Sequence, residues 1–502
     1  MSSLRRLAGG SAFRVADVVV QVAAALWITP QMLHALGRER YGLWVTAITL
    51  VNYIDIFDLG LTSAVTRYVS RALGRNAPGE AREIVRSAFS ILLAIGLGCL
   101  LLIGLLAFVA PWLLPTASAN VPLRAIIVIF GATVALSFPL RVFSGVLEAH
   151  VRYELTALVS ILRALLVTVA LSIALHTGAG LITVVTIIAV GGLLQRCLNW
   201  QFARRVFPEM RLLPLGVTPE ARRALLDYGT KNFLMKLVEI IRFRIDNLVV
   251  ARFVSVAAVS VYAPGMSLIR YFREVIDCLG AVLMPMFSRD EGAGDHERIR
   301  TNLIRSTRVC AVVAMLIGGG IMLYGDLFID RWLGPGFHDA YLVALILAPP
   351  FIVAMAQNPG IYLLYALSKQ ERLLRLNVVE AALNLSLSLA LAVRFGMLGV
   401  AAGTAISLLL TKVAFQPMIL CDETGVQRSS YYCNAMGLPI FAAAVPMVLC
   451  HLALRPWLRA DYLHLVCAAT AQIACVSLVV WWILFSKTER DTFAGILFRK
   501  PA

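Results

Sequence analysis

The chain has 502 residues, of which 60% are hydrophobic and 15% are charged, and its formal net charge is +16. This apolar fraction, together with apolar runs of about 20 residues from end to end, excludes a soluble domain and predicts an all-α polytopic membrane protein. A nucleic-acid partner is not expected, because the basic residues cluster in alternate loops.

The first apolar segment follows Arg5, Arg6 and Arg14 and continues to Leu36, which is too long for a cleaved signal peptide. We therefore predict that it is the first of about fourteen membrane spans, delimited by apolar runs, charge clusters and Gly or Pro punctuation. The predicted spans cover residues 13–36, 41–72, 83–112, 122–148, 152–175, 180–206, 223–253, 259–288, 298–330, 338–367, 372–394, 397–420, 433–454 and 462–486.

Lys and Arg gather in the loops on one side of these spans. The positive-inside rule makes that side, which includes both termini, cytoplasmic. The loops on the other side are short, so the function is expected to lie within the helix bundle. The nine cysteines form no CxxC motif and the seven histidines show no metal-ligand spacing. We expect no metal site, no cofactor and no catalytic residue.

An internal repeat becomes visible when the chain is shifted by about 220 residues. Residues 138–155 then fall on residues 358–375, which aligns Pro139 with Pro359 and Arg152 with Arg372. Six predicted spans separate the copies, so the two halves have parallel orientation. The predicted organisation is an N-lobe (1–207), a cytoplasmic linker (208–222), a C-lobe (223–421), and a C-terminal part with the last two spans and a cytoplasmic tail (422–502).

Charged residues recur on spans that hydropathy alone would expose to lipid. A charge at the bilayer centre costs about 2.5–3.5 kcal/mol on the insertion scale, so we expect these side chains to face a polar interior. On the seventh span, positions 231, 239, 242 and 246 fall within about 80° of arc, and the eighth span contains two i,i+4 pairs. The residues concerned are Lys231, Lys236, Glu239, Arg242 and Asp246 on the seventh span, Arg270, Arg273, Glu274 and Asp277 on the eighth, and Arg163 on the fifth.

The basic members of this set outnumber the acidic ones, and a cavity with surplus positive charge suits an anionic ligand. Guanidinium groups bind phosphate oxygens in a bidentate manner. The predicted diphosphate- and sugar-binding residues are Lys236, Arg242, Arg270, Arg273, Arg163 and Lys231. Ion pairs that only hold helices together are the alternative. The acidic residues Asp17, Asp55, Asp58, Glu239, Asp246 and Asp277, with Glu380, are expected either to couple transport to H⁺ or Na⁺ or to act as counter-charges.

Three short motifs carry a family resemblance: YGLW at 41–44, DLGL at 58–61 and RYVS at 67–70, with RIDNLVVARFVSVAAVSVY at 244–262. Together with the spans and the repeat, they make the chain similar to bacterial polysaccharide exporters. These are the lipid-linked oligosaccharide flippases of the multidrug/oligosaccharidyl-lipid/polysaccharide superfamily.

The resemblance implies two pseudo-repeated six-helix lobes in a V, plus two C-terminal helices, in the bacterial inner membrane. It implies a non-enzymatic flippase that moves an undecaprenyl-diphosphate-linked oligosaccharide repeat unit by alternating access, for exopolysaccharide, capsule or O-antigen synthesis. The implied partners are the lipid-linked oligosaccharide, membrane lipids, a polysaccharide polymerase and an initiating glycosyltransferase.

Three alternative functions remain open at this point. A multidrug exporter of the same superfamily would be expected to have twelve spans and a net acidic cavity for organic cations. A lipid II flippase would share the fourteen spans and the cationic cavity, whereas YGLW and DLGL favour the exopolysaccharide or O-antigen branch. A membrane polymerase or ligase would be expected to carry a large outer loop with Arg, His or carboxylate side chains, and the outer loops here are short.

Overall fold

The computed structural model describes residues 2–113, 123–208, 210 and 216–483, and every regular element in these residues is a helix. The all-α prediction is therefore confirmed. The predicted tail beyond residue 483 and positions 209 and 211–215 of the predicted linker lie outside the described residues. The described chain divides into two compact units, unit 1 (residues 1–261) and unit 2 (residues 262–502), and the division falls inside α10.

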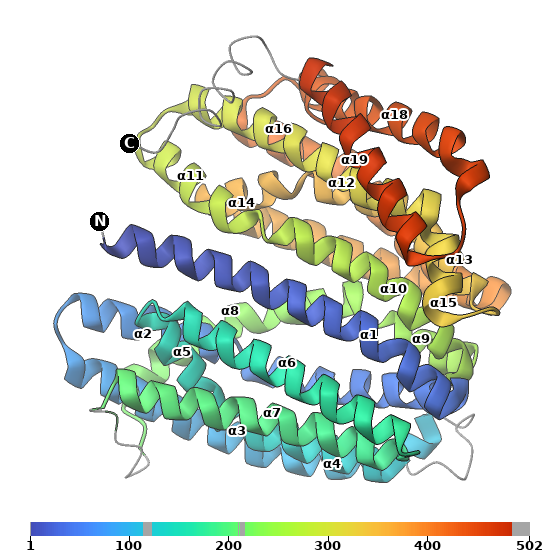
Figure 1. Cartoon of the computed structure of the whole chain (residues 1–502). Helices are drawn as coiled ribbons and strands as arrows, with labels where there is room; N and C mark the ends of the chain where they lie inside the picture. The colour runs from blue at the N-terminus through green and yellow to red at the C-terminus, as the bar shows by residue number, and fades with distance from the viewer. Residues whose placement is uncertain (1, 114–122, 209, 211–215, 484–502) are drawn as a thin grey trace. The chain divides into compact units, whose positions relative to one another are not determined.

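Unit 1 packs its long helices side by side, with α1 against α6, α3 against α4, and α7 against α4 and α6 (Figure 1). The elements that begin in unit 1 are α1 (Ser2–Asn52), η1 (Tyr53–Asp58), α2 (Leu61–Gly74), α3 (Pro78–Leu113), α4 (Leu123–Ser137), η2 (Pro139–Arg141), α5 (Val142–Ala149), α6 (Tyr153–His176), α7 (Leu181–Val206), α8 (Pro219–Phe243), α9 (Asp246–Phe253) and α10 (Val256–Asp277).

Unit 2 is built around α12, which contacts α13, α14, α18 and α19. Its elements after α10 are α11 (Gly280–Gly292), α12 (His296–Leu333), α13 (His338–Ala356), α14 (Asn358–Ala366), α15 (Gln370–Leu409), the π-helix η3 (Leu410–Phe415), α16 (Gln416–Thr424), α17 (Arg428–Ser430), the π-helix η4 (Tyr431–Gly437), α18 (Leu438–Leu454), η5 (Arg455–Trp457) and α19 (Tyr462–Ile483).

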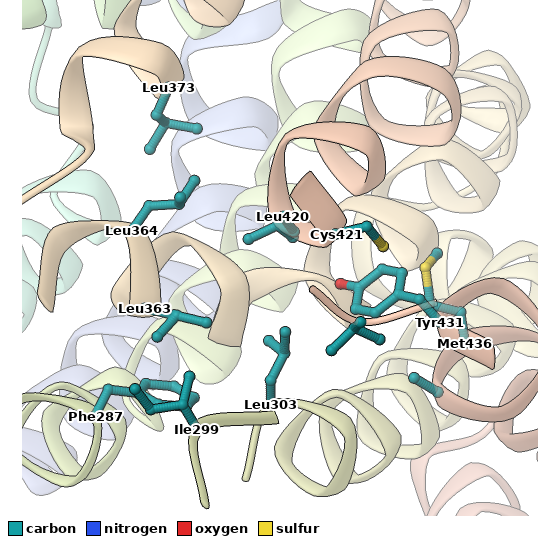
Figure 2. Close-up of a cluster of buried hydrophobic side chains, with 12 residues drawn as sticks. Phe287, Ile299, Leu303, Leu363, Leu364, Leu373, Leu420, Cys421, Tyr431 and Met436 are labelled. Carbon is teal, nitrogen blue, oxygen red and sulfur yellow. The ribbon is translucent and has the colours of Figure 1, made fainter. Parts of the chain in front are cut away.

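One buried cluster joins the charged end of α12 to α14, α16 and η4. Leu303, Leu363 and Leu420 are almost fully buried in it, and the Tyr431 ring lies beside Leu420 (Figure 2). A second cluster packs α18 and α19 onto α12, with Met447 and Val476 fully buried. Within a membrane such helices are held together by van der Waals packing and interhelical hydrogen bonds, because lipid tails are as apolar as the packed side chains.

Among the described residues, nine helices are long and apolar enough to cross a membrane, or ten if the bent pair of Leu123–Ser137 and Pro139–Ala149 is one span. Two of these each contain two predicted spans, which are separated by Gly37 (φ +77°) and Gly396 (φ +59°). Neither the α8–α9 segment nor the α10–α11 segment is among the nine, and these segments carry the predicted polar stripe. The chain is a multi-pass membrane protein, and the number fourteen stays a prediction.

The internal repeat is confirmed by the backbone. The turn after α5 has Val151 at φ +58°, and the turn after α14 has Ser368 at φ +56°, although residues other than glycine rarely adopt positive φ. Both turns close with the same two bonds, from Val151 N to Glu148 O and Arg152 N to Leu147 O, and from Ser368 N to Tyr365 O and Lys369 N to Leu364 O.

Other helix breaks recur at the same spacing. Breaks and turns pair at Gly37 and Val254, Asp58 and Asp277, Asn76 and Gly294, Val151 and Ser368, and Gly178 and Gly396, which are 217, 219, 218, 217 and 218 positions apart by residue number. The repeat predicted from the sequence is thus present, but its spacing is slightly shorter than 220. The matching turn bonds pair Arg152 with Lys369, so the predicted alignment of Arg152 with Arg372 and of Pro139 with Pro359 was wrong. The lobe boundary at 208–222 stays a prediction; the contacts of α8 are with α2, α3 and η1 of unit 1.

Candidate functional site

The DLGL motif forms the break between η1 and α2, and its aspartate holds a cation. Leu59 (φ +51°) and Gly60 (φ +68°) stop the helix, so that Asp58 ends η1 as a buried side chain, 4% exposed. Lys236 Nζ of α8 lies 3.0 Å from Asp58 Oδ2, and Thr62 Oγ1 donates to Oδ1 at 3.0 Å. Asp58 is thus the counter-charge of Lys236, which remains 39% exposed.

A second ion pair lies close by in unit 1. Arg141 Nη2 of η2 donates to Asp55 Oδ1, and the Arg141 guanidinium also lies 4.4 Å from the Phe138 ring centre. Arg196 of α7 lies within electrostatic reach of Arg141, Asp55 and Asp58. The sequence analysis did not single out Arg141 and Arg196, because both fall near span ends where charge reads as a topology signal. Their interior placement depends on tertiary packing.

The first and sixth helices share a smaller polar group. Gln21 Nε2 donates to Asp17 Oδ1 at 3.2 Å and to Ser160 Oγ at 2.9 Å. Arg163 Nη2 lies 3.5 Å from Gln21 Oε1. The predicted residues Asp17 and Arg163 are therefore brought together through one amide, rather than through a direct ion pair.

The predicted arc on the seventh span is interrupted. α8 ends at Phe243 and α9 begins at Asp246, so the assumption of one continuous helix through both residues was wrong. Tyr53 of η1 donates to Arg244 O at 3.0 Å, which helps to hold this break. Asp246 is 1% exposed, whereas Glu239 is exposed.

Two further basic residues of α8 were predicted to bind the diphosphate, Arg242 and Lys231. The Arg242 guanidinium lies 4.6 Å from the Phe243 ring centre, a cation–π contact. The side chain of Lys231 lies outside the described part of the chain.

On α10 the two predicted i,i+4 pairs are present. Arg273 Nε lies 3.5 Å from Asp277 Oδ2, and Arg270 Nε lies 3.9 Å from Glu274 Oε1. Asp277 Oδ1 also accepts a hydrogen bond from Asn358 Nδ2 at 3.1 Å, so this carboxylate is shared between α10 and α14. The Arg270 side chain is 57% exposed and that of Arg273 is 28% exposed. Arg270 therefore keeps donors accessible to a ligand.

A deeply buried ion pair joins α15 to the π-helix η3, and the sequence indicates only one of its two members. Glu380 was expected at membrane depth, but its partner, Lys412 Nζ, lies 3.3 Å from Glu380 Oε2 in a pair that is 3–4% exposed. Thr411 Oγ1 donates to the same carboxylate at 2.9 Å, and Lys412 Nζ donates to Gln416 Oε1 at 2.7 Å. No hydropathy window shows this pair, because Lys412 is a single charge within an apolar run.

No group of three or more His, Cys, Asp and Glu side chains in the described ranges is placed to hold a metal ion. The basic side chains of α8 and α10 offer guanidinium and ammonium donors for binding. Lys236 and Arg242 carry such donors on α8, and Arg270 and Arg273 carry them on α10.

Comparison with known proteins agrees with this membrane-transporter architecture. Residues 35–342 match the model of the family described as polysaccharide biosynthesis protein. The chain is 21% identical over 482 residues to the "uncharacterized membrane protein EpsK" of Bacillus subtilis, and the match covers 94% of each chain. It is 22% identical over 422 residues to the "Probable flippase AglR" of Haloferax volcanii, covering 82% of this chain and 83% of that one.

Solved structures match the fold at low sequence identity. An inward-facing multidrug resistance MATE family transporter has a TM-score of 0.69 at 13% identity, and the match covers 83% of this chain and 99% of the transporter. The lipid II flippase MurJ in an inward closed conformation has a TM-score of 0.67 at 12% identity, with 98% of both chains covered. These likenesses show a shared transporter fold and leave the cargo to be argued from the residues.

Proposed function

Because the chain belongs to the polysaccharide biosynthesis protein family, whose model covers more than half of it, we propose that it flips an undecaprenyl-diphosphate-linked oligosaccharide repeat unit across the inner membrane. The flipped unit serves surface polysaccharide synthesis. The termini are cytoplasmic in this proposal, and the two lobes rock to open the binding cavity alternately to either side.

The observation that carries the proposal is the surplus of accessible cationic donors on α8 and α10. Arg270 is more than half exposed, and its nearest carboxylate lies 3.9 Å away, beyond hydrogen-bond distance. A diphosphate offers several oxygens to such a guanidinium fork, and charge-assisted bonds of this kind are about twice as strong as neutral ones. We assign the diphosphate to Arg270, Arg273 and Arg242, with Lys231, Lys236 and Arg163 as further cationic residues of the cavity.

The acidic residues divide into two roles in this proposal. Asp58 and Asp55 are counter-charges, because each is held by a basic side chain. Asp17 is the better coupling group, since its carboxylate accepts a hydrogen bond from the neutral amide of Gln21. H⁺ or Na⁺ coupling at Asp17 would make transport depend on the ion gradient, whereas Asp17→Asn would make it independent of that gradient.

The alternatives differ in cargo. A multidrug exporter shares the fold but would take organic cations, which the cationic residues of α8 and α10 disfavour. A lipid II flippase would act on the peptidoglycan precursor instead of a surface polysaccharide unit. A polymerase or ligase would act after flipping.

The test uses the native bacterium with the gene deleted. Polyprenyl-linked sugars are extracted and their leaflet is determined, while surface polysaccharide is assayed in parallel. The proposal expects loss of the surface polymer and accumulation of single repeat units on the cytoplasmic leaflet. Accumulation on the outer leaflet would instead indicate an enzyme that acts after flipping, and unchanged polymer with increased sensitivity to cationic drugs would indicate a multidrug exporter.

Complementation of the deletion strain with variants tests whether Arg270 and Arg273 bind the diphosphate. The double variant Arg270→Gln, Arg273→Gln is expected to insert normally and to restore less than about 1% of export, since losing two charge-assisted contacts of about 1.5–3 kcal/mol each lowers binding more than 100-fold. The matched control is Arg394→Gln, Arg459→Gln, which removes two exposed arginines of unit 2 far along the chain from α10. Full export by the first variant at wild-type abundance would refute this assignment.

A further inference from the structure

A hollow of about 810 Å³ lies at the charged turn between α11 and α12, wholly within unit 2. Arg289 of α11 lines it, together with Arg298, Thr301 and Arg305 of α12. The three α12 residues are spaced i, i+3 and i+7, so they lie on one face of the helix. This hollow belongs neither to α8 nor to α10, and the proposed function does not use it.

Two other arginines of α12 show what such side chains do when they have a structural role. Arg300 Nε donates to Thr424 O at 2.8 Å, and Arg308 Nε donates to Asn434 O at 3.0 Å. These two arginines fasten α12 to the α16–η4 segment through backbone carbonyls. Arg289, Arg298 and Arg305 line the hollow.

The carboxylates around the hollow have other tasks. Asp290 is buried and accepts a hydrogen bond from Asn302 Nδ2 at 2.6 Å. Asp295 caps α12 by accepting from Arg298 N at 3.0 Å, and its second oxygen lies 3.6 Å from Arg298 Nε. Glu297 is 85% exposed and points towards Arg300 at 3.9 Å. Asp290 and Glu297 are thus directed at Asn302 and Arg300, and Asp295 is shared between the N-terminus of α12 and Arg298. Arg289, Arg298, Arg305 and Thr301 are the basic and hydroxyl-bearing residues that line the hollow.

The repeat shows that the fold does not require basic residues at positions 298 and 305, whereas the counterpart of Arg289 is also basic, Arg71. The α2–α3 turn of unit 1 is the counterpart of the α11–α12 turn, since Asn76 and Gly294 adopt positive φ 218 positions apart. At the same offset, the counterparts of Arg298, Thr301 and Arg305 are Glu80, Glu83 and Ser87. Ser87 is buried, and its Oγ accepts a hydrogen bond from Thr218 N at 3.3 Å. The same hairpin is thus stable with two acids and a serine on this face.

We propose that the α11–α12 hollow is a binding site for a phosphate group carried by an amphiphile. Guanidinium forks and a hydroxyl are the donors that phosphate oxygens accept. Pro285 and Met286 add an apolar wall beside them, which suits the first carbons of a lipid tail. The site is separate from the proposed transport cavity, and its occupancy does not depend on which cargo the chain moves.

The test measures binding to the purified full-length protein in detergent, after removal of lipid, by native mass spectrometry. The probes are dioleoylphosphatidylglycerol, dioleoylglycerol and inorganic pyrophosphate. The variant Arg289→Gln, Arg305→Gln is compared with the control Arg71→Gln, Arg75→Gln, which removes the same charge from the α2–α3 turn. A second variant, Arg289→Lys, Arg305→Lys, keeps the charge and removes the planar forks.

Phosphatidylglycerol is expected to bind and dioleoylglycerol is not. The Gln variant is expected to lose about tenfold or more in affinity, the Lys variant to lose less, and the control to change less than about twofold. Pyrophosphate binding with the same arginine dependence would identify a soluble phosphate as an additional source, and its absence would restrict the site to lipid. Equal loss in the control, retained binding in the Gln variant, or equal binding of dioleoylglycerol would overturn the proposal.

Discussion

The buried Glu380–Lys412 ion pair allows a direct test of how much a buried charge contributes to the stability of unit 2. Substituting Lys412 by Met leaves Glu380 buried without its cation and removes the donor to Gln416. Removing one partner of a buried ion pair costs about 3–5 kcal/mol, because the remaining charge keeps its desolvation penalty. For a cooperative unit of roughly 240 residues, at about 2–4 °C per kcal/mol, this lowers the thermal transition by roughly 10 °C.

The matched double variant Glu380→Gln, Lys412→Met removes both charges. The amide introduced in place of the Glu380 carboxylate keeps an acceptor for Thr411, and Met fills the volume of the lysine stem. Neutral replacement of a buried pair is often close to neutral in stability, so the double variant is expected to recover most of the loss and lie within about 1 kcal/mol of the wild type. The single substitutions are therefore expected to be strongly non-additive.

The assay is differential scanning fluorimetry of the detergent-solubilised protein, with Lys412→Met, Glu380→Gln and the double variant prepared in parallel. A transition of Lys412→Met within about 2–3 °C of the wild type would show that Glu380 finds another partner or takes up a proton without cost, at about 2–4 °C per kcal/mol. A double variant as unstable as the single one would show that packing, and not charge, sets the loss. Either result would refute the reasoning.

Two further predictions concern unit 1. Gly42→Ala is expected to lower the thermal transition by the equivalent of about 1–3 kcal/mol, because the added Cβ would lie 2.0 Å from Val256 O. The control is Gly98→Ala, whose added Cβ meets open space. Equal transition temperatures for the two variants would contradict the close approach at Gly42. Asp58→Asn is expected to cost about 1–2 kcal/mol, discounted because Lys236 is partly exposed. In a double-mutant cycle with Lys236→Met, a coupling near zero would contradict the ion pair.

Much of the architecture could be predicted because it depends on periodicity and local backbone rules. The helical class, the repeat and the two α10 pairs all follow from spacing along the chain. Gly60 indicates a possible helix break in the sequence, but the sequence does not show that this break buries Asp58 beside Lys236. The prediction that failed was that the seventh span is one continuous helix. An interruption such as that at residues 244–245, like a kink or a π-turn, changes the angular position of every later residue around the helix axis.

Ion pairs between residues far apart in the chain could not be predicted from the sequence either. Lys412 meets Glu380 across the reversal at Gly396, and Asp55 meets Arg141 from a helix 86 positions later. No pattern in a single sequence predicts either ion pair, because each depends on the register with which two helices pack. The candidate cavity residues and the i,i+4 partners of Arg270 and Arg273 follow from spacing, but the pairing of Lys236 with Asp58 could be identified only once the helices were placed.

The matching positive-φ turns at Val151 and Ser368 bear on the history of the chain. A backbone conformation that neither valine nor serine favours is inherited rather than reinvented, so its recurrence at one spacing points to duplication and fusion of a gene for a protein of about half this length. The ancestral protein would then have worked as a pair of identical copies. The helices α18 and α19 correspond to the two C-terminal spans that are expected in addition to the two lobes, and in this history they would be an addition to the fused chain.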